Sequence, residues 1–404
     1  MKSSKRRGLA AVGLGGALVL MTAACGSGSG SGADAAAARA GSKAPSASAS
    51  PGPTVSAAVV KIEPADGAKD VKPGGALKVS VASGKLSTVK VTDQQGRAVD
   101  GAVTADGSGW APKGALSVGQ KYTVNATAAD QAGLAATATS SFTTLTPEDE
   151  ASPHDNIDAQ GTYGVGMIVS LEFDRDVKDR KAVEAGITFD TSDGSVVKGH
   201  WFGSRRVDFR PESYWKPDTK VTVHYRLKGV EIAPDVYGGV DADEPFTIGR
   251  SQISTVDASS DEMKVERGGQ VTATYPITAG KPGFASWNGT MVIGEKSGTT
   301  RMTSQGITSA KGEEYDLQVP HAMRLTTSGT YVHGNYWSDA FGSYNASHGC
   351  IGLSDTQAGS GSSDAGKFFD SSLVGDVVKV VNSKGGQVEP DNGLSGWNVP
   401  WGNW

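Results

Sequence analysis

Between about residue 55 and residue 249, the chain consists of short runs in which apolar and polar residues alternate. Examples are residues 77–81 (LKVSV) and 122–126 (YTVNA), and clusters of Gly, Asp, Pro and Ser separate such runs. Alternation with a period of two puts the apolar side chains on one face of a strand, and frequent turns are typical of antiparallel β-sandwiches. The pattern therefore predicts a mainly β protein that begins with sandwich domains.

A weak internal repeat divides this region into two modules. Residues 116–126 (LSVGQKYTVNA) align without gaps to residues 215–225 (WKPDTKVTVHY), at a shift of 99 residues. One immunoglobulin-like module is about 100 residues long. We expect the first module over residues 55–147 and the second over 148–250, and neither has a cysteine for an inter-sheet disulfide.

The segment from residue 251 onward has a different pattern. Strand-like runs at 290–293 and 375–381 flank a middle part that is rich in Gly, Ser and aromatic residues. One short helix is expected around residues 354–369. The pattern predicts a third, β-rich domain over 251–383 whose chemistry lies on loops.

A tail over residues 384–404 follows the third domain. Its last 12 residues hold three of the eight tryptophans of the chain, and so short a segment cannot form a core of its own. The tail is expected to dock on the folded part. It braces the third domain or the junction of that domain with the second sandwich, or it is a simple C-terminal strap.

The N-terminus has the pattern of an export signal. Four basic residues among the first seven precede an uncharged stretch over 8–24, which ends in Ala-Ala before Cys25. This arrangement resembles the lipobox of bacterial lipoproteins, which implies lipidation of Cys25 and anchoring to the outer face of the cell membrane, facing the cell wall. An uncleaved membrane anchor and an ordinary secreted protein are the alternatives. Residues 26–54, made of Gly, Ser, Ala and Pro, are expected to form a disordered linker.

Charge and cysteine content narrow the function. The formal net charge is −5 and no long basic run occurs, which argues against nucleic acid as a partner. The chain has two cysteines, and lipidation of Cys25 leaves Cys350 without a disulfide partner. An unpaired thiol outside the cytoplasm is open to oxidation, so its presence indicates a chemical role.

Cys350 stands in the run Ser-His-Gly-Cys, 17 residues after His333. A thiolate is the attacking species, and a histidine can supply the base that forms it. The flanking glycines leave the backbone N–H groups of Gly349 and Cys350 free to bind a developing oxyanion. On an extended strand His348 shares a face with Cys350, whereas His333 comes from a separate strand, with the Gly334 carbonyl as a possible orienting group.

Other interpretations of these residues remain open at this point. They are a structural cysteine beside surface histidines, a zinc site from His333, His348 and Cys350, and a different cysteine hydrolase, such as a papain-like peptidase, a cell-wall amidase or a sortase. The zinc signatures His-Glu-x-x-His and Cys-x-x-Cys are absent. No metal or cofactor is expected. The remaining histidines of the two sandwiches show no metal-ligand spacing: His154, His200 and His224.

At these residues the chain resembles the L,D-transpeptidases of bacterial cell-wall synthesis, whose signature is a histidine followed some 14 to 17 residues later by Ser/Thr-His-Gly-Cys. The order of lipobox signal, two immunoglobulin-like domains, catalytic domain and Trp-rich tail is similar to that of actinobacterial and mycobacterial members. The resemblance implies two immunoglobulin-like β-sandwiches followed by a β-rich catalytic domain with a docked tail.

The resemblance also implies roles for individual residues. Cys350 is the nucleophile, His333 the general base, Gly349 with Cys350 the oxyanion hole, and His348 a residue that shapes the site. One departure is Gly352, where the family usually has Asn or Arg. The implied substrate-binding positions are Tyr315, Ser347, Trp337, Met302 and Gly334, with Ser304 as a looser match.

The implied reaction is attack by Cys350 on the third residue of a peptidoglycan tetrapeptide stem, with loss of the terminal D-alanine. An acceptor amine from a neighbouring stem then resolves the thioester into a 3–3 cross-link. Resolution by water makes the protein an L,D-carboxypeptidase instead, and a non-catalytic wall-binding lipoprotein scaffold is the third alternative. The resemblance further implies acylation by carbapenem β-lactams.

Overall fold

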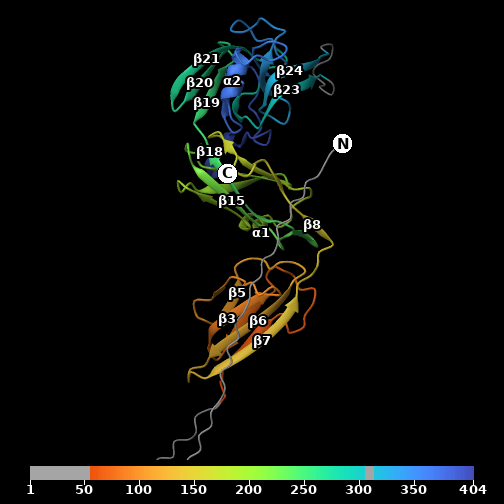
Figure 1. The fold of residues 1–404 in the computed structure, drawn as a ribbon, viewed down its shortest axis with the longest axis vertical. Helices are drawn as coiled ribbons and strands as arrows, with labels where there is room; N and C mark the ends of the chain where they lie inside the picture. The colour runs from red at the N-terminus through yellow and green to blue at the C-terminus, as the bar shows by residue number, and fades with distance from the viewer. Residues whose placement is uncertain (1–54, 305–313) are drawn as a thin grey trace, which may run out of the picture. The chain divides into compact units, whose positions relative to one another are not determined.

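The computed structural model describes residues 55–304 and 314–404, and it is mainly β, as expected (Figure 1). The first module is a sandwich of a four-stranded and a three-stranded antiparallel sheet around a core that contains Trp110 and Phe142. Its sheets have the strand orders β1-β2-β5-β4 and β3-β6-β7. The strands are β1 (Val59–Glu63), β2 (Lys78–Ala82), β3 (Lys85–Asp93), β4 (Gly101–Val103), β5 (Gly109–Pro112), β6 (Lys121–Ala129) and β7 (Ala135–Thr143).

The second module contains two four-stranded sheets, ordered β10-β18-β15-β12 and β13-β14-β11-β9, and a small sheet β16-β17-β8. A one-turn helix, α1 (Arg180–Ala185), was not anticipated from the sequence. The strands are β8 (Asp149–Ala151), β9 (His154–Asp155), β10 (Thr162–Tyr163), β11 (Val169–Glu172), β12 (Ile187–Thr191), β13 (Val197–Phe202), β14 (Arg206–Pro211), β15 (Lys220–Arg226), β16 (Glu231–Ala233), β17 (Val236–Gly238) and β18 (Asp241–Ile248).

The internal repeat corresponds to one local structure that occurs twice. Leu116 and Trp215, the first matched pair, are both buried, and the following strands β6 and β15 bury alternate residues. In each module a turn leads from the matched residue into the strand, and this turn contains a residue in the left-handed conformation. That residue is Gly119 in the first module and Asp218 in the second, each with φ of 63°. The matched strands thus bury the same alternate positions in the two sandwiches, whereas the turns before them differ, with Val118 buried and its match Pro217 exposed.

The third domain is built on one nine-stranded sheet, in the order β22-β27-β19-β20-β21-β26-β25-β24-β23. Most neighbours are antiparallel, but β25 and β26 run parallel, as do β19 and β27. The strands are β19 (Gln252–Asp257), β20 (Glu262–Arg267), β21 (Gln270–Thr278), β22 (Gly289–Val292), β23 (Glu295–Thr303), β24 (Asp316–Arg324), β25 (Tyr331–Asn335), β26 (Ile351–Ser354) and β27 (Val377–Val381).

Helix α2 (Asp364–Ser371) packs Ala365 and Phe368 into the core of the third domain. The helix expected over 354–369 therefore begins about ten residues later than predicted. Residues 351–354 belong to β26 instead, and the Gly- and Ser-rich residues 355–363 form turns. The helix begins where the Ser363 side chain accepts a hydrogen bond from the Gly366 N–H, a typical N-cap.

The Trp-rich tail docks on the second module and the third domain together. Trp397 donates from Nε1 to the Gly166 carbonyl at 2.7 Å, and Asn398 donates to the Thr290 carbonyl of β22 at 2.8 Å. The guanidinium of Arg210 on β14 lies over the rings of three tail tryptophans. Of the expected roles, the tail has the one that braces the junction. It includes the short 3-10 turns Gly396–Asn398 and Trp401–Asn403.

The predicted export signal over 1–25, the lipidation site Cys25 and the linker over 26–54 lie outside the described residues. Among the residues that are described, none of the helices has the length and apolar character needed to cross a bilayer.

Candidate active site

Two parallel neighbouring strands bring the predicted histidine and cysteine together. β25 carries His333, and β26 begins at Ile351, directly after Cys350. His333 is the register partner of Gly352, so Cys350 stands only two residues from the position that faces His333. The 17-residue separation in sequence thus becomes proximity because both segments end in adjacent strands of one sheet.

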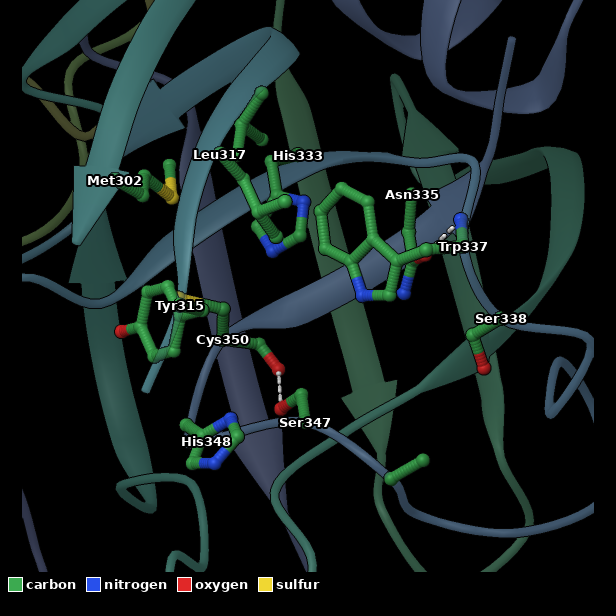
Figure 2. Close-up of a pocket in the computed structure, with 12 residues that line it drawn as sticks. Met302, Tyr315, Leu317, His333, Asn335, Trp337, Ser338, Ser347, His348 and Cys350 are labelled. Atoms are coloured by element: carbon green, nitrogen blue, oxygen red, sulfur yellow. Dashed lines mark hydrogen bonds between the residues drawn. The ribbon is translucent and has the colours of Figure 1, made fainter. Parts of the chain in front are cut away.

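Both side chains line one cavity of about 360 Å³, with the remaining walls from β23, β24 and the segment after β25 (Figure 2). Every substrate-binding residue expected from the sequence contributes to its wall except Gly334 and the looser match Ser304. Gly349 also lies outside the lining. The lining residues are Met302, Tyr315, Leu317, Val319, His333, Asn335, Trp337, Ser338, Ala346, Ser347, His348 and Cys350.

His333 is buried and held in one orientation. Its Nδ1 lies 2.9 Å from the Gly334 carbonyl oxygen, the orienting contact that the sequence suggested. A carbonyl only accepts, so Nδ1 carries the proton and Nε2 keeps a lone pair. The ring stacks on that of Trp337, with centroids 5.7 Å apart. Burial lowers the pKa of His333, which makes it a neutral base in the resting site.

A second polar pair lies behind the Gly334 peptide. The buried carboxylate of Asp355 accepts through Oδ2 from Nδ1 of the His321 imidazole, at 2.6 Å. A Cβ on Gly334 would lie 2.1 Å from that carboxylate oxygen. Glycine is therefore required at this position for the carboxylate to approach, and Gly334 acts through its carbonyl on His333 rather than as a wall of the cavity.

Cys350 is a neutral thiol in this state. Its Sγ lies 3.6 Å from the Gly329 carbonyl, to which the S–H donates, and burial raises the pKa of the thiol to about 11. Within residues 55–304 and 314–404, no hydrogen bond joins the sulfur to His333. A neutral thiol thus faces the same cavity as a neutral imidazole, and any reaction through a thiolate requires a proton transfer from the sulfur first.

The run Ser347 to Cys350 is a bend and not the extended strand considered from the sequence. Gly349 has φ of +114°, which a side chain would strain, and regular pairing starts only at Ile351. The Gly349 N–H donates to Ser347 Oγ at 3.1 Å, and that hydroxyl donates to the Cys350 carbonyl at 2.6 Å. The Gly349 amide, expected to be free, is therefore occupied in this state, which leaves the Cys350 N–H as the available donor.

Ser286, which the sequence did not single out, fixes this donor. It is buried in the loop between β21 and β22, and its Oγ donates to the Gly349 carbonyl at 2.8 Å while accepting from the Gly280 N–H at 3.0 Å. In a planar trans peptide the C=O and the next N–H point in opposite directions. Holding the Gly349 carbonyl against Ser286 therefore turns the Cys350 N–H away from the loop.

Aromatic contacts define the other side of the cavity. The His348 ring lies between Phe284, with centroids 4.6 Å apart, and Tyr315, at 5.3 Å. Ser304 exchanges hydrogen bonds with the Tyr315 backbone, its Oγ accepting from the Tyr315 N–H at 3.0 Å. Burial raises the pKa of the Tyr315 phenol, so this side chain stays neutral. His348 and Ser304 thus position Tyr315 at the wall.

Sequence reasoning missed five residues of the lining. For Asn335 a signal existed, because it stands two positions after His333 on one strand and shares its face. Leu317 and Val319 carried the same signal, because they stand two and four positions after Tyr315. Ser338 and Ala346 lie outside the strands, so their place at the wall depends on the path of the chain in space. In the described part of the chain, no cluster of His, Cys, Asp and Glu side chains could hold a metal ion.

The fold and this cavity define a multidomain β protein with a cysteine–histidine site in its last domain. Residues 251–380 match the L,D-transpeptidase catalytic domain, and residues 68–231 match the bacterial Ig domain. L,D-transpeptidase 2 of Mycobacterium tuberculosis is 33% identical over 342 residues, which are 84% of this chain and 82% of the relative. The chain therefore belongs to the L,D-transpeptidase family, as its motif indicated.

Two further relatives have lower similarity or coverage. L,D-transpeptidase 5 of Mycobacterium tuberculosis is 28% identical over 351 residues, covering 84% of this chain and 75% of the relative. The solved structure of the transpeptidase LdtMt1 in complex with imipenem is 31% identical, covers 58% of this chain and 100% of that chain, and has a TM-score of 0.49.

Proposed function

We propose that the protein is a peptidoglycan L,D-transpeptidase that forms 3–3 cross-links through a thioester on Cys350. The observation that carries this proposal is the cavity that Cys350 and the oriented base His333 line together, next to a Gly349–Cys350 peptide that Ser286 holds in one orientation. Family membership supports the reaction class. The proposed substrates are a donor tetrapeptide stem and an acceptor amine on a neighbouring stem.

In the first half-reaction, His333 Nε2 accepts the thiol proton while Cys350 Sγ bonds to the carbonyl carbon of the third stem residue. The carbonyl oxygen becomes an oxyanion, and the Cys350 N–H donates to it. The carbon–nitrogen bond to the terminal D-alanine then breaks, and the imidazolium returns its proton to the departing amine. The products are free D-alanine and a thioester.

In the second half-reaction, the acceptor amine attacks the thioester carbonyl. His333 takes a proton from the attacking amine and delivers it to the departing sulfur, so that the thiol is regenerated and an amide cross-link remains. Attack by water through the same steps releases a tripeptide, which is L,D-carboxypeptidase activity. Because a β-lactam carbonyl can meet the same nucleophile, we further propose that carbapenems acylate Cys350.

We also propose that the protein acts outside the cytoplasm, anchored by lipid on Cys25 to the outer face of the cell membrane and facing the wall. The Ala-Ala-Cys pattern after a basic, then uncharged N-terminus supports this location. Radioactive or click-labelled fatty acid should label the native protein but not Cys25→Ala. Equal labelling of both proteins, or none of either, would contradict the anchor.

Two measurements test the reaction. Purified protein is mixed with a carbapenem, and intact and peptide mass spectra should locate the adduct on Cys350. Disaccharide-tetrapeptide is then incubated with the protein, and the muropeptide products should include the 3–3 dimer. Tripeptide alone would replace transpeptidase by carboxypeptidase activity, and neither adduct nor product from folded protein would favour a non-catalytic wall-binding scaffold. Cys350→Ala is the matched inactive control.

A further inference from the structure

Asn335 ends β25, two residues after His333, and its side chain enters the same cavity. The residue is only 4% exposed, so its side-chain polarity is shielded from bulk water. Figure 2 shows its amide beside the Trp337 ring, on the cavity side of the strand. A buried amide in this position requires partners for both of its ends.

The orientation of the amide follows from its one protein contact. Asn335 Oδ1 accepts from the Trp337 N–H at 3.1 Å. A backbone N–H can only donate, so the atom that faces it must be the amide oxygen. The amide nitrogen therefore points the other way, into the cavity. Among the described residues nothing accepts a hydrogen bond from it.

Gly352 provides the room for this nitrogen. A Cβ at Gly352 would lie 3.2 Å from Asn335 Nδ2 and 3.4 Å from Asn335 Cβ. A side chain at residue 352 and the present position of the amide therefore compete for one volume. Gly352 is the departure from the family pattern noted in the sequence, and Asn335 on the neighbouring strand places a polar amide next to it.

The charge of the cavity wall limits what this nitrogen can bind. The described residues of the lining include no lysine or arginine, and none of them has a carboxylate that could accept from the amide. Recognition of oxygen atoms at this wall therefore falls to neutral donors. A peptide carbonyl is a neutral acceptor of matching strength, and the substrate chain carries one at each residue.

We propose that Asn335 is a substrate-binding residue whose Nδ2–H donates to a backbone carbonyl oxygen of the donor stem peptide next to the scissile bond. This inference rests on the proposed function, because it takes a stem peptide as the occupant of the cavity. The bond fixes the stem against β25, with its reactive carbonyl between His333 and Cys350. Asn335 takes no part in proton transfer.

Two substitutions separate this role from a structural one. Asn335→Asp keeps an oxygen to accept from the Trp337 N–H but replaces the donor by a second acceptor, whereas Asn335→Ala removes both. Loss of one neutral hydrogen bond weakens binding about 3- to 10-fold. Asn335→Asp should weaken it at least as much, because a carboxylate oxygen then faces a carbonyl oxygen. Asn125→Asp, an exposed change of the same charge in the first module, is the control.

The readouts are the Kd of disaccharide-tetrapeptide for each variant in a Cys350→Ala background, and kcat/KM of each variant with Cys350 intact. Both Asn335 variants should lose tetrapeptide affinity and kcat/KM, and in the uncharged variant Asn335→Ala a retained circular dichroism spectrum and thermal midpoint should show that the fold is intact. Wild-type affinity and turnover in Asn335→Asp, with losses only in Asn335→Ala, would overturn the donor role and leave the proposed function standing. Absence of both binding and turnover in wild type would overturn both.

Discussion

The hydroxyl of Ser286 is predicted to control the oxyanion donor at the site without touching the substrate. Ser286→Ala removes the 2.8 Å bond to the Gly349 carbonyl and the 3.0 Å bond from the Gly280 N–H. The Gly349–Cys350 peptide then loses the contact that directs the Cys350 N–H. Because the Gly349 N–H donates to Ser347 Oγ, it is not free to take over as the donor.

The size of the effect has two bounds. Complete loss of one oxyanion donor lowers acylation about 10²- to 10³-fold. Ser286→Ala leaves the donor in place but frees its orientation, so we expect a loss of at least about 10-fold and no more than that range. Two buried backbone groups lose their partner, and we expect the free energy of unfolding to fall by about 1–3 kcal/mol.

The assay is the second-order rate constant of carbapenem acylation, measured by intact mass against time. Iodoacetamide alkylation of the same proteins serves as an internal reference, because it attacks a saturated carbon and forms no oxyanion. The matched control is Ser254→Ala, which removes another buried serine hydroxyl of the third domain, one with no hydrogen-bond partner among the residues that the structure describes. Acylation of Ser286→Ala at the wild-type rate, or equal loss of acylation and alkylation, would refute the reasoning.

Three further predictions follow from the site and the tail. His333→Ala should lower carbapenem acylation at least about 100-fold with the fold retained by circular dichroism, and wild-type rates would remove His333 as the base. Arg210→Ala should lower the free energy of unfolding in urea by about 2–4 kcal/mol, because the guanidinium lies 4.2 Å from the Trp404 ring centre and donates to the Val399 carbonyl at 2.7 Å. The control is Lys198→Ala, because Lys198 is exposed and its ammonium lies 4.5 Å from the Trp401 ring centre. This change should lower the free energy of unfolding by less than about 1 kcal/mol. Equal costs for the two would contradict the bracing role. Burial raises the pKa of Cys350 to about 11, so the thiol's contribution to the free energy of unfolding is fully present below the pKa of the unfolded thiol and is lost as pH rises toward 11. The lowered pKa of His333 has the opposite sign, and it reduces the free energy of unfolding below about pH 6.5. Unfolding measured from pH 8 to 11 should therefore decline less in Cys350→Ala than in wild type, and parallel curves would argue against the buried neutral thiol.

Much of the architecture could be predicted from local patterns in the sequence. Alternating runs predicted the sandwiches because one buried face per strand imposes a period of two. The repeat at Leu116 and Trp215 marked equivalent strands, down to a turn that accepts Gly119 in one module and Asp218 in the other. The helix start was misjudged because its cap, Ser363, is one serine among several in a turn-rich segment.

The residues of the candidate site could be predicted from the sequence only in part. His333, Cys350 and the aromatic positions could be named from the motif, and the orienting carbonyl of Gly334 from its adjacency to the histidine. The contacts of Ser286 and Asn335 could not be named in this way. Ser286 is 63 residues from its partner Gly349, and nothing near it in sequence indicates that the loop meets the bend. Whether the Gly349 amide is free was equally beyond the motif, because Ser347 competes for it within the bend.

The sequence by itself determined the residue types and their periodicity and pointed to Cys350 and His333 as the candidate pair, because these depend on side-chain chemistry and on geometry within a few residues. Tertiary structure alone decided the protonation and direction of that pair. Burial of Cys350 and His333 sets their pKa values in opposite directions, and both shifts arise from surroundings contributed by distant segments of the chain. It also decided the direction of the Cys350 N–H, since peptide orientation is fixed by hydrogen bonds that the folded loops make with one another.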